Sequence, residues 1–585
     1  MRQAQSLHFT THDGVELYYR HWPAQREPGQ DKRAVVMFHR GHEHGGRMAH
    51  LVEELNLPDH DFFAWDARGH GQSPGARGDS PGFATSVRDV QTFIEHIGHQ
   101  HDIAEEDVAV LAQSVGAVLV ATWAHDYAPK VRCLVLASPA FSIKLYVPFA
   151  RTGLKLMRAW RGNFFVNSYV KPQLLTHDPE RVLSYVSDPL ITRPISVNML
   201  LGLYEAADRV VADAQAIQVP TQVLISGADV VVRRKPQEQF FDRLGTLHKE
   251  KHVLPGFFHD TLGERDRAHA VARIRRFVVQ CFQQPVQRPS LLDADRQGAS
   301  CAEAESLAAP LPTYSPRNLY WRATRASLRL GKTLSEGVRL GFDTGFDSGS
   351  TLDYVYRNQA TGKGKLGELV DRNYLDAIGW RGIRQRKVHA EELLRRAIEQ
   401  LRQQGKPVHI VDIAAGHGRY ILEALQGLEQ RPDSILLRDY SDLNVTQGTA
   451  LIAEKGLEDI ARFVQGDAFD RASLAALDPR PTLAVVSGLY ELFPSNDLIR
   501  ASLAGLADAV EDGGYLVYTG QPWHPQLEMI ARALTSHRGG EAWVMRRRSQ
   551  AEMDQLVAAA GFRKLEQRID EWGIFSVSLA RRVRE

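Results

Sequence analysis

One stretch of this chain has no regular apolar period, and it divides the sequence into two halves. Residues 283–315 contain four prolines and show neither the alternating nor the helical spacing of apolar residues, which is typical of a linker. On each side, short apolar runs alternate with helical spacing, which predicts buried strands joined by helices. A chain of 585 residues has room for two such α/β domains. We therefore expect two domains, each with a site at the carboxyl ends of its strands.

The composition is ordinary for a globular protein, with 43% hydrophobic and 24% charged residues. A formal net charge of +1 gives no electrostatic reason to expect a nucleic-acid partner. Three cysteines, far apart in the sequence, argue against a disulfide framework or a zinc site, so we expect no metal. No apolar run has the features of a signal peptide or the length of a membrane span, and the expected location is the cytoplasm.

The first half, residues 1–282, predicts a mostly parallel sheet. Two alternating runs around the turn 11–14 predict an N-terminal hairpin. Buried strands are then predicted at 34–38, 62–65, 108–111, 133–136, 223–225 and 252–254. A helical insertion over about 141–215 interrupts this pattern. Its large apolar residues are Leu145, Tyr146, Val147, Phe149, Leu154, Leu156, Met157, Trp160, Phe164 and Phe165.

A candidate nucleophile stands at the end of the third of these strands. Ser114 follows the strand and precedes a helical pattern, and small neighbouring residues allow the tight turn that presents its hydroxyl. A serine hydroxyl needs a base that is oriented by a third group. Asp229 and His259 follow later strands in the required order of serine, acid and histidine. The oxyanion hole needs two backbone N–H groups, which Val115 and Gly41 are placed to supply.

These segments, together with the turn 39–47 and the run 65–73, resemble the monoacylglycerol lipase and lysophospholipase branch of the α/β-hydrolases. The resemblance implies an α/β-hydrolase fold, hydrolysis of a small-molecule or lipid-like ester, and a cap formed by residues 141–215. Arg40 and His42 stand where that family usually has glycines. Two readings of the cap stay open: its apolar residues either face an acyl chain or pack the cap's own core.

The second half predicts a doubly wound sheet over residues 370–585. Strands are predicted at 408–412, 435–439, 463–467, 483–487, 515–518, 565–569 and 574–579. The last two are separated by a short turn, which predicts a terminal antiparallel hairpin. The first strand ends at Asp412 and leads into a turn that contains Ala414, Gly416 and Gly418. Such a glycine turn lets a nucleoside ligand approach the backbone closely.

Two further acids follow the next strands of this half. Asp439 ends the second strand, where a carboxylate can hold ribose hydroxyls, and Asp467 follows the third. With the glycine turn they resemble class I methyltransferases, although Ala414 replaces the usual first glycine. The resemblance implies a Rossmann-like fold that binds S-adenosylmethionine, with Asp412 and Asp467 holding its amino-acid end and its adenine. A phosphate-binding dinucleotide domain is the alternative, which the missing G-x-G-x-x-G pattern and the antiparallel end disfavour.

The sequence leaves the methyl acceptor open. Tyr490, Glu491 and His524 are candidates to face it, although a structural role is the favoured reading for each. The run 546–548, three arginines, is expected to be a solvated face and weak evidence for nucleic acid.

Residues 316–369 are expected to form an extension of the second domain. A basic amphipathic helix is predicted over 318–340. Packing of this helix on its own domain is favoured. The alternative is contact with an anionic membrane surface, which would place the protein at the periphery of the inner membrane. Residues 341–364 are glycine-rich and predict a mobile loop or lid.

The whole arrangement resembles bacterial bifunctional proteins in which an α/β-hydrolase precedes a class I methyltransferase. The leading hypothesis is an enzyme that hydrolyses a lipid-like ester at one site and methylates an unknown acceptor at the other. The alternative is that one half is catalytically lapsed and serves as a binding or scaffold module.

Overall fold

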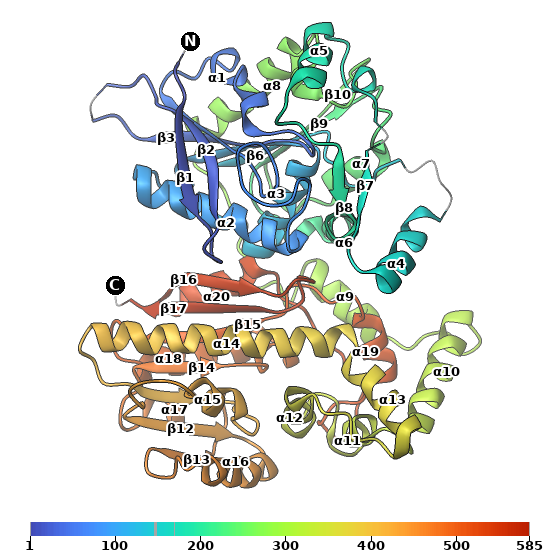
Figure 1. The fold of residues 1–585 in the computed structure, drawn as a ribbon. Coiled ribbons are helices and arrows are strands. Elements are labelled where there is room, and N and C mark those ends of the chain that lie inside the picture. The colour runs from blue at the N-terminus through green and yellow to red at the C-terminus, as the bar shows by residue number, and fades with distance from the viewer. Residues whose placement is uncertain (1, 28, 145–148, 169, 584–585) are drawn as a thin grey trace. The chain divides into compact units, whose positions relative to one another are not determined.

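The computed structural model describes residues 2–27, 29–144, 149–168 and 170–583 (Figure 1). Three of the apolar residues named in the insertion, Leu145, Tyr146 and Val147, lie outside these ranges. The chain forms two compact units, Met1–Pro289 and Ser290–Glu585. Each unit contains one large sheet flanked by helices, so the prediction of two α/β folds is confirmed.

The first unit is built on an eight-stranded sheet with the order β1-β2-β4-β3-β5-β6-β9-β10. The first two strands form the predicted hairpin, β2 pairs antiparallel with β4, and the remaining neighbours pair in parallel. The strands are β1 (Gln5–Thr10), β2 (Glu16–Trp22), β3 (Arg33–Phe38), β4 (His60–Trp65), β5 (Val108–Gln113), β6 (Cys133–Ala137), β9 (Thr221–Ser226) and β10 (Lys249–Leu254).

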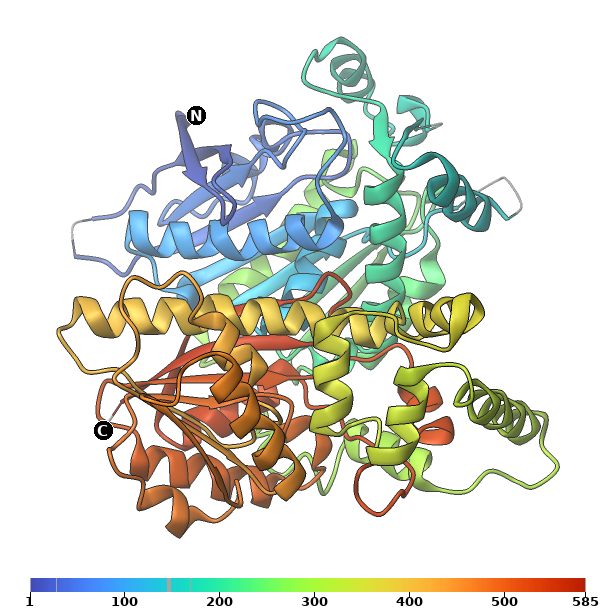
Figure 2. The ribbon, with the colours of Figure 1, turned by 60° about the horizontal axis from the view of Figure 1, so that its bottom comes forward.

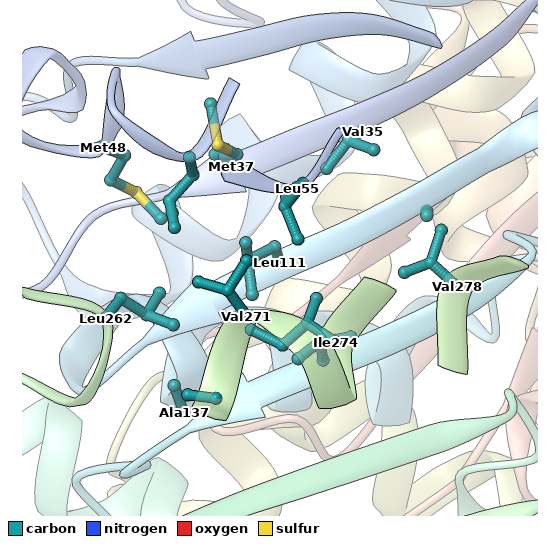
Figure 3. Close-up of a cluster of buried hydrophobic side chains, with 14 of the residues drawn as sticks. Val35, Met37, Met48, Leu55, Leu111, Ala137, Leu262, Val271, Ile274 and Val278 are labelled. Atoms are coloured by element: carbon teal, nitrogen blue, oxygen red, sulfur yellow. The ribbon is translucent and has the colours of Figure 1, made fainter. Parts of the chain in front are cut away.

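Helices cover both faces of this sheet, which is why its central strands are apolar at nearly every position. On one face, side chains of α1 and α8 pack with Met37 and Leu111 in a buried cluster (Figure 3). On the other face, Phe93 of α2 packs against Phe38 and Trp65. These helices are α1 (Leu51–Glu54), α2 (Phe83–His101), α3 (Val115–Tyr127), α7 (Arg234–Arg243) and α8 (Ala268–Gln283).

Between β6 and β9 the chain forms a mainly helical insertion. Its elements are α4 (Ala150–Arg161), β7 (Phe165–Asn167), α5 (Pro179–Ser187), β8 (Pro194–Ser196) and α6 (Val197–Ala212). The sequence does not predict the short antiparallel pair of β7 and β8, because each strand has only three residues. Short 3-10 turns complete the chain: η1 (Gly45–Met48), η2 (Glu105–Asp107), η3 (Pro172–Leu174), η4 (Ala214–Ala216), η5 (Thr261–Gly263) and η6 (Tyr490–Leu492).

The second unit has a seven-stranded sheet with the order β13-β12-β11-β14-β15-β17-β16. The first five strands in this order are parallel, and β17 is antiparallel to both of its neighbours, as predicted. The strands are β11 (His409–Asp412), β12 (Ser434–Asp439), β13 (Ala461–Gln465), β14 (Leu483–Val486), β15 (Tyr515–Gly520), β16 (Phe562–Ile569) and β17 (Ser576–Arg582).

Helices pack on both faces of this second sheet. Figure 2 shows α14 as one long yellow helix beside the strands, and its apolar side chains join those of β11, β14 and β15 in one core. α18 and α20 contribute to the core on the opposite face. The helices are α14 (Ile378–Gln403), α15 (Arg419–Ala424), α16 (Asp442–Glu454), α17 (Arg471–Ala475), α18 (Asn496–Ala509), α19 (Leu527–Ala533) and α20 (Gln550–Ala559).

The segment before α14 is more ordered than the sequence predicts. It holds α9 (Ala299–Ala308), α10 (Pro316–Gly331), α11 (Glu336–Thr344), α12 (Gly349–Arg357) and α13 (Gly364–Leu375). The single helix predicted over 318–340 is therefore two helices, because Ser335 caps a new helix by accepting from the backbone N–H of Val338. The loop predicted over 341–364 contains α12, which Ser348 caps in the same way.

The linker predicted over 283–315 is wrong for most of its length. α9 lies inside it, and residues from 290 onward belong to the second unit. Asp295 accepts a hydrogen bond from the backbone N–H of Asn496 at 2.7 Å, and Leu291 N–H donates to Gln555 at 2.7 Å. Polar contacts of this kind leave no apolar period, so the sequence pattern does not reveal them.

The arginine run 546–548 is buried rather than solvated, which corrects the prediction. Arg546 forms an ion pair with Glu552 at 2.7 Å. Arg548 donates to the backbone oxygens of Tyr490 and Phe493. These guanidinium groups donate hydrogen bonds to backbone oxygens of residues 490–494, which are thereby satisfied inside the protein. Within the described residues, no helix is long and apolar enough to cross a membrane.

Candidate active sites

Ser114 lies in the sharp turn between β5 and α3, with φ 56° and ψ −115°. A non-glycine residue in this region stores backbone strain, which the surrounding structure must hold in place. Gly116 shows how tightly the turn is packed, because a Cβ atom there would lie 2.4 Å from the backbone oxygen of His39. The turn therefore presents the serine at the carboxyl end of the sheet.

The structure brings the three predicted triad residues together. Ser114 Oγ lies 2.8 Å from His259 Nε2, and His259 Nδ1 lies 2.7 Å from Asp229 Oδ2. All three side chains are buried. The second oxygen of Asp229 accepts from the backbone N–H groups of Val231 and Val232. Burial alone would raise the pKa of Asp229, but His259 and these N–H groups hold that pKa below its ordinary value.

Val115 and Gly41, the predicted oxyanion residues, lie next to each other. A Cβ atom on Gly41 would lie 3.0 Å from Val115 Cγ2, and both residues line the cavity that contains Ser114. Val115 is the first residue of α3, so its backbone N–H has no partner within the helix. Arg40, which replaces one of the usual glycines, also lines the cavity, and it makes a two-pronged ion pair with Glu43 at 2.8 Å within the same turn.

A cavity of about 990 Å³ opens over Ser114, and the insertion supplies much of its apolar wall. Phe149, Leu154 and Met157 line this cavity, whereas Phe164 packs against the buried side chains of α6. Trp160 is 89% exposed and belongs to neither group. The apolar residues of the insertion thus divide: some line the cavity, Phe164 packs in the insertion's own core, and Leu154 does both.

A buried ion network ties the insertion to the loop that carries the histidine. Arg181 of α5 donates to Asp260 at 3.0 Å and to the backbone oxygen of Arg47 at 2.8 Å. Asp260 directly follows His259 in the chain and also accepts from Gln113 at 3.1 Å. Burial would raise the pKa of Asp260, but the guanidinium groups of Arg181 and Arg40 hold it far below its ordinary value.

In the second unit, the glycine turn after β11 adopts backbone angles that favour glycine. Gly416 has φ 59° and Gly418 has φ 75°, and a Cβ atom on Gly418 would lie 2.4 Å from Leu437 Cδ1. Asp439 holds this turn, since it accepts from the backbone N–H of Gly416 at 2.9 Å. Its other oxygen accepts from Asn444 Nδ2 at 3.0 Å.

Five of the six predicted cofactor residues line one cavity of about 570 Å³. They are Ala414, Gly416, Gly418, Asp439 and Asp467. Asp467 is exposed and uses one oxygen to accept from the backbone N–H of Phe469 at 2.8 Å. The cavity thus combines a glycine turn with two carboxylates at the ends of neighbouring strands.

Asp412 departs from its predicted role, because it does not line this cavity. Its side chain is fully buried and accepts from the hydroxyl of Tyr420 and from the backbone N–H of Ala414. Burial raises its pKa to about 7, and the nearby charge of Asp439 adds to the shift. Asp412 thus holds the backbone of the glycine turn through Ala414, and its side chain does not face the cavity.

The sequence analysis missed part of the cavity wall. Ser350 and Leu352, at the start of α12, line it, and so do His537 and Arg538. The helix-capping serine at 348 is the one sequence signal that indicates order here. Among the three candidates for facing an acceptor, Tyr490 donates to Ser502 in the core, whereas Glu491 and His524 line a second, neighbouring cavity.

Comparison with known proteins agrees with this division of the chain. A family described as "Putative methyltransferase" matches residues 274–582, more than half of the sequence. The chain belongs to this family. Residues 29–266 of the same chain match a second family, described as "Serine aminopeptidase, S33". An α/β-hydrolase domain therefore precedes a domain of the methyltransferase family, and the predicted resemblance is confirmed.

Similar proteins cover either the whole chain or its first half. "Uncharacterized protein YnbC" of Escherichia coli (strain K12) is 56% identical over 572 residues, which cover 98% of this chain and 97% of the relative. A monoacylglycerol lipase of Mycolicibacterium smegmatis is 25% identical over 46% of this chain and 94% of the relative. The monoglyceride lipase of Homo sapiens is 28% identical over 43% of this chain and 82% of the relative. The hydrolase domain is thus similar to monoglyceride lipases.

Proposed function

We propose that this protein is a bifunctional enzyme, a serine ester hydrolase joined to an S-adenosylmethionine-dependent methyltransferase. The hydrogen-bonded chain from Ser114 through His259 to Asp229 carries the first part of the proposal. The apolar cavity above it favours a lipid-like ester, of the kind that the names of the lipase relatives indicate for those proteins. The alternative of a lapsed site is not favoured, because the triad contacts are formed and both cavities lie beside the expected residues.

Each hydrolase residue has a role in the proposed reaction. His259 accepts the proton of the Ser114 hydroxyl as this oxygen attacks the ester carbonyl, and Asp229 stabilises the imidazolium that results. The backbone N–H groups of Val115 and Gly41 are placed to stabilise the charge on the carbonyl oxygen. His259 then returns the proton to the departing alcohol, and a water molecule releases the acid by the reverse sequence.

A fluorophosphonate probe tests this part directly, because it phosphonylates only an activated serine. We expect the intact protein to be labelled, with the added mass on the peptide that contains Ser114. The Ser114→Ala variant serves as the control and should stay unlabelled. Equal labelling of both proteins, or labelling of another residue, rejects the assignment.

The cavity beside the glycine turn in the second unit fits S-adenosylmethionine by the chemistry of its residues. A carboxylate offers about four acceptor positions, and three of those on Asp439 are used by the backbone of Gly416 and Ser441 and by Asn444, which leaves one for a ribose hydroxyl. Asp467 is exposed and placed to accept from an exocyclic amine of a base. When bound, S-adenosylmethionine supplies a methyl group on a positively charged sulfur.

Calorimetry with S-adenosylhomocysteine tests this part on the full-length protein. We expect a single site that saturates, and a competing titration with S-adenosylmethionine should displace the first ligand. The Ser114→Ala variant should give the same binding curve. The absence of binding to the folded protein rejects the cofactor assignment.

A further inference from the structure

A second cavity of about 340 Å³ lies beside the proposed cofactor cavity in the second unit. The two cavities share four wall residues, Asp347, Leu352, Gly488 and Leu492. Transfer of a methyl group requires the acceptor atom to lie about 3–3.5 Å from the methyl carbon, on the side opposite the sulfur. A neighbouring cavity with a shared wall is the arrangement that such an in-line transfer needs.

The walls of the second cavity are mostly apolar. They come from the helical segment before the sheet, from α14, from α19 and the segment after it, and from the loop before β17. They include Phe346, Trp380, Ile383, Leu534, Met545 and Phe575. The volume is near the lower end of the range for small-molecule sites, about 300–1,000 Å³. The cavity therefore suits a compact molecule with an apolar body.

Five polar side chains of this wall each keep a buried atom without a hydrogen-bond partner among the described residues. Tyr374 Oη and Trp543 Nε1 are two of them, and the other three are Arg386 Nε, Glu491 Oε2 and Gln521 Nε2. Arg386 is 3% exposed, Glu491 6% and Gln521 4%. Buried polar atoms are almost always paired in folded proteins, because an unpaired one costs about 1–3 kcal/mol. Five such atoms on one cavity wall, three of them on Arg386, Glu491 and Gln521, indicate a polar ligand group that pairs with some of them.

The remaining contacts of these residues fix their positions. Glu491 Oε1 accepts from Thr519 at 2.7 Å and lies 3.7 Å from a terminal nitrogen of Arg386. His524 also lines the cavity, and its Nδ1 accepts from the backbone N–H of Gln526 at 3.0 Å. Burial lowers the pKa of His524 to about 4, so the ring is neutral and its Nε2–H is a further donor.

We propose that this cavity binds the methyl acceptor, and that the acceptor is a small apolar alcohol or phenol whose hydroxyl is deprotonated by Glu491. The inference rests on the proposed methyltransferase function and adds the substrate class. A hydroxyl both donates, here to Glu491, and accepts, here from Arg386 or Gln521. A carboxylate only accepts, and it would place a second negative charge beside Glu491, so the site selects against it.

The reaction balances with these groups and S-adenosylmethionine as the methyl donor. The hydroxyl proton moves to the free oxygen of Glu491, while the acceptor oxygen forms a bond to the methyl carbon. The bond between that carbon and sulfur breaks, and its electron pair stays on sulfur, which becomes a neutral thioether. Arg386 and Gln521 stabilise the negative charge that grows on the acceptor oxygen. The product is a methyl ether.

Matched probes with one apolar body separate these possibilities: 1-naphthol, 1-naphthoic acid and naphthalene. Binding to the full-length protein is followed by probe fluorescence in the presence of S-adenosylhomocysteine. We expect 1-naphthol to bind at least tenfold more tightly than either of the others. With labelled S-adenosylmethionine, label should appear in 1-methoxynaphthalene. A labelled methyl ester of 1-naphthoic acid, or no preference for 1-naphthol, overturns the inference.

Two variants and one control locate the site. Met529→Trp, which fills the cavity from a half-buried position, should weaken 1-naphthol binding at least tenfold. Glu491→Gln should lower methyl transfer by about 10²- to 10⁴-fold, as expected for loss of a base. Glu454→Gln, on the exposed side of α16, should change neither. Unchanged transfer by Glu491→Gln overturns the role of Glu491.

Calorimetry with S-adenosylhomocysteine accompanies every variant and separates the two proposals. Binding within about twofold of the unmodified protein shows that a variant is folded and that its cofactor site is intact. Cofactor binding without any 1-naphthol binding overturns the acceptor inference alone. Failure of the unmodified protein to bind S-adenosylhomocysteine overturns the proposed methyltransferase function, and the acceptor inference with it.

Discussion

The two candidate sites differ in how their polar groups are satisfied. In the hydrolase half, the key side chains bond to one another, from Ser114 to His259 to Asp229. In the methyltransferase half, Asp439 bonds to the backbone around it, and Arg386 and Glu491 keep atoms without partners among the described residues. If the proposed functions hold, the site for covalent catalysis is formed before its ligand binds, whereas the site for methyl transfer keeps polar groups that a ligand would pair with.

The chemistry of each proposed reaction accounts for this difference. A serine is a weak nucleophile, so the protein itself must supply the base and the group that orients it. Methyl transfer from a sulfonium needs mainly correct placement of two molecules, so the protein supplies cavities and acceptor atoms. Substitutions should therefore act mainly on the rate in the first half and mainly on binding in the second, apart from Glu491.

The largest effect is expected from the nucleophile. Ser114→Ala should lower the hydrolysis of p-nitrophenyl esters by roughly 10⁴- to 10⁶-fold, as for other members of catalytic triads. Binding of S-adenosylhomocysteine, measured by calorimetry, should not change. Residual hydrolysis within tenfold of the unmodified protein would show that the bonded chain is not the reactive site, and the contrast between the halves would fail.

The matching substitution in the second half should act on binding. Asp439→Ala removes the carboxylate that would accept from a ribose hydroxyl, one hydrogen bond to a charged group worth about 1.5–3 kcal/mol, and should weaken S-adenosylhomocysteine binding by roughly 10- to 150-fold. Ester hydrolysis serves as the internal readout and should stay constant. Asp459→Ala, an exposed residue outside the cavity, is the control. Equal affinities of the two variants would contradict a ligand role for Asp439.

A smaller effect is expected from the apolar wall of the hydrolase cavity. From acetate to medium-chain p-nitrophenyl esters, kcat/KM should rise by up to about fourfold for each added CH₂, equivalent to about 0.8 kcal/mol. Met157→Ala should flatten this rise because Met157 lines the cavity. Trp160→Ala on the same helix should leave it unchanged, since that side chain is 89% exposed. A steady fall in kcat/KM from acetate onward would indicate a small polar substrate.

The smallest effect concerns Asp412, whose pKa is raised to about 7 by burial. The folded protein then holds a proton that the unfolded chain releases near pH 4, so this group's contribution to stability falls as the pH rises through about 4–7. An asparagine does not titrate. The melting temperature of Asp412→Asn, measured by calorimetry without ligand, should therefore gain a few degrees on the unmodified protein between pH 5 and pH 8. A constant difference would show that Asp412 has an ordinary pKa.

The sequence predicts those features that depend on local order along the chain. Both sheets and the ends of their strands follow from apolar runs, and the triad follows because each member comes directly after a strand. The position of Asp412 could not be predicted in this way. The glycine turn fixes its backbone, but its side chain turns inward to Tyr420, eight residues further along the chain.

Features that depend on distant polar partners were also not predictable. Arg546 and Arg548 look like surface residues because three consecutive arginines usually are, yet Glu552, Asn496 and backbone oxygens of one loop bind them. The second cavity is equally hidden, since its walls come from segments far apart in the sequence. Glu491 could be named as a candidate, but its free oxygen is visible only in the folded chain.

The contact between Arg181 and Asp260 limits how a substrate reaches Ser114. This pair joins α5 to the residue after His259, and breaking a buried ion pair costs about 3–5 kcal/mol. A swing of α5 away from the sheet would therefore pull on the catalytic base. α4 has no fully buried side chain, and its ion pairs with α6 are at the surface. Moving α4 should thus cost less free energy than moving α5, and we expect a substrate to enter the cavity on the α4 side.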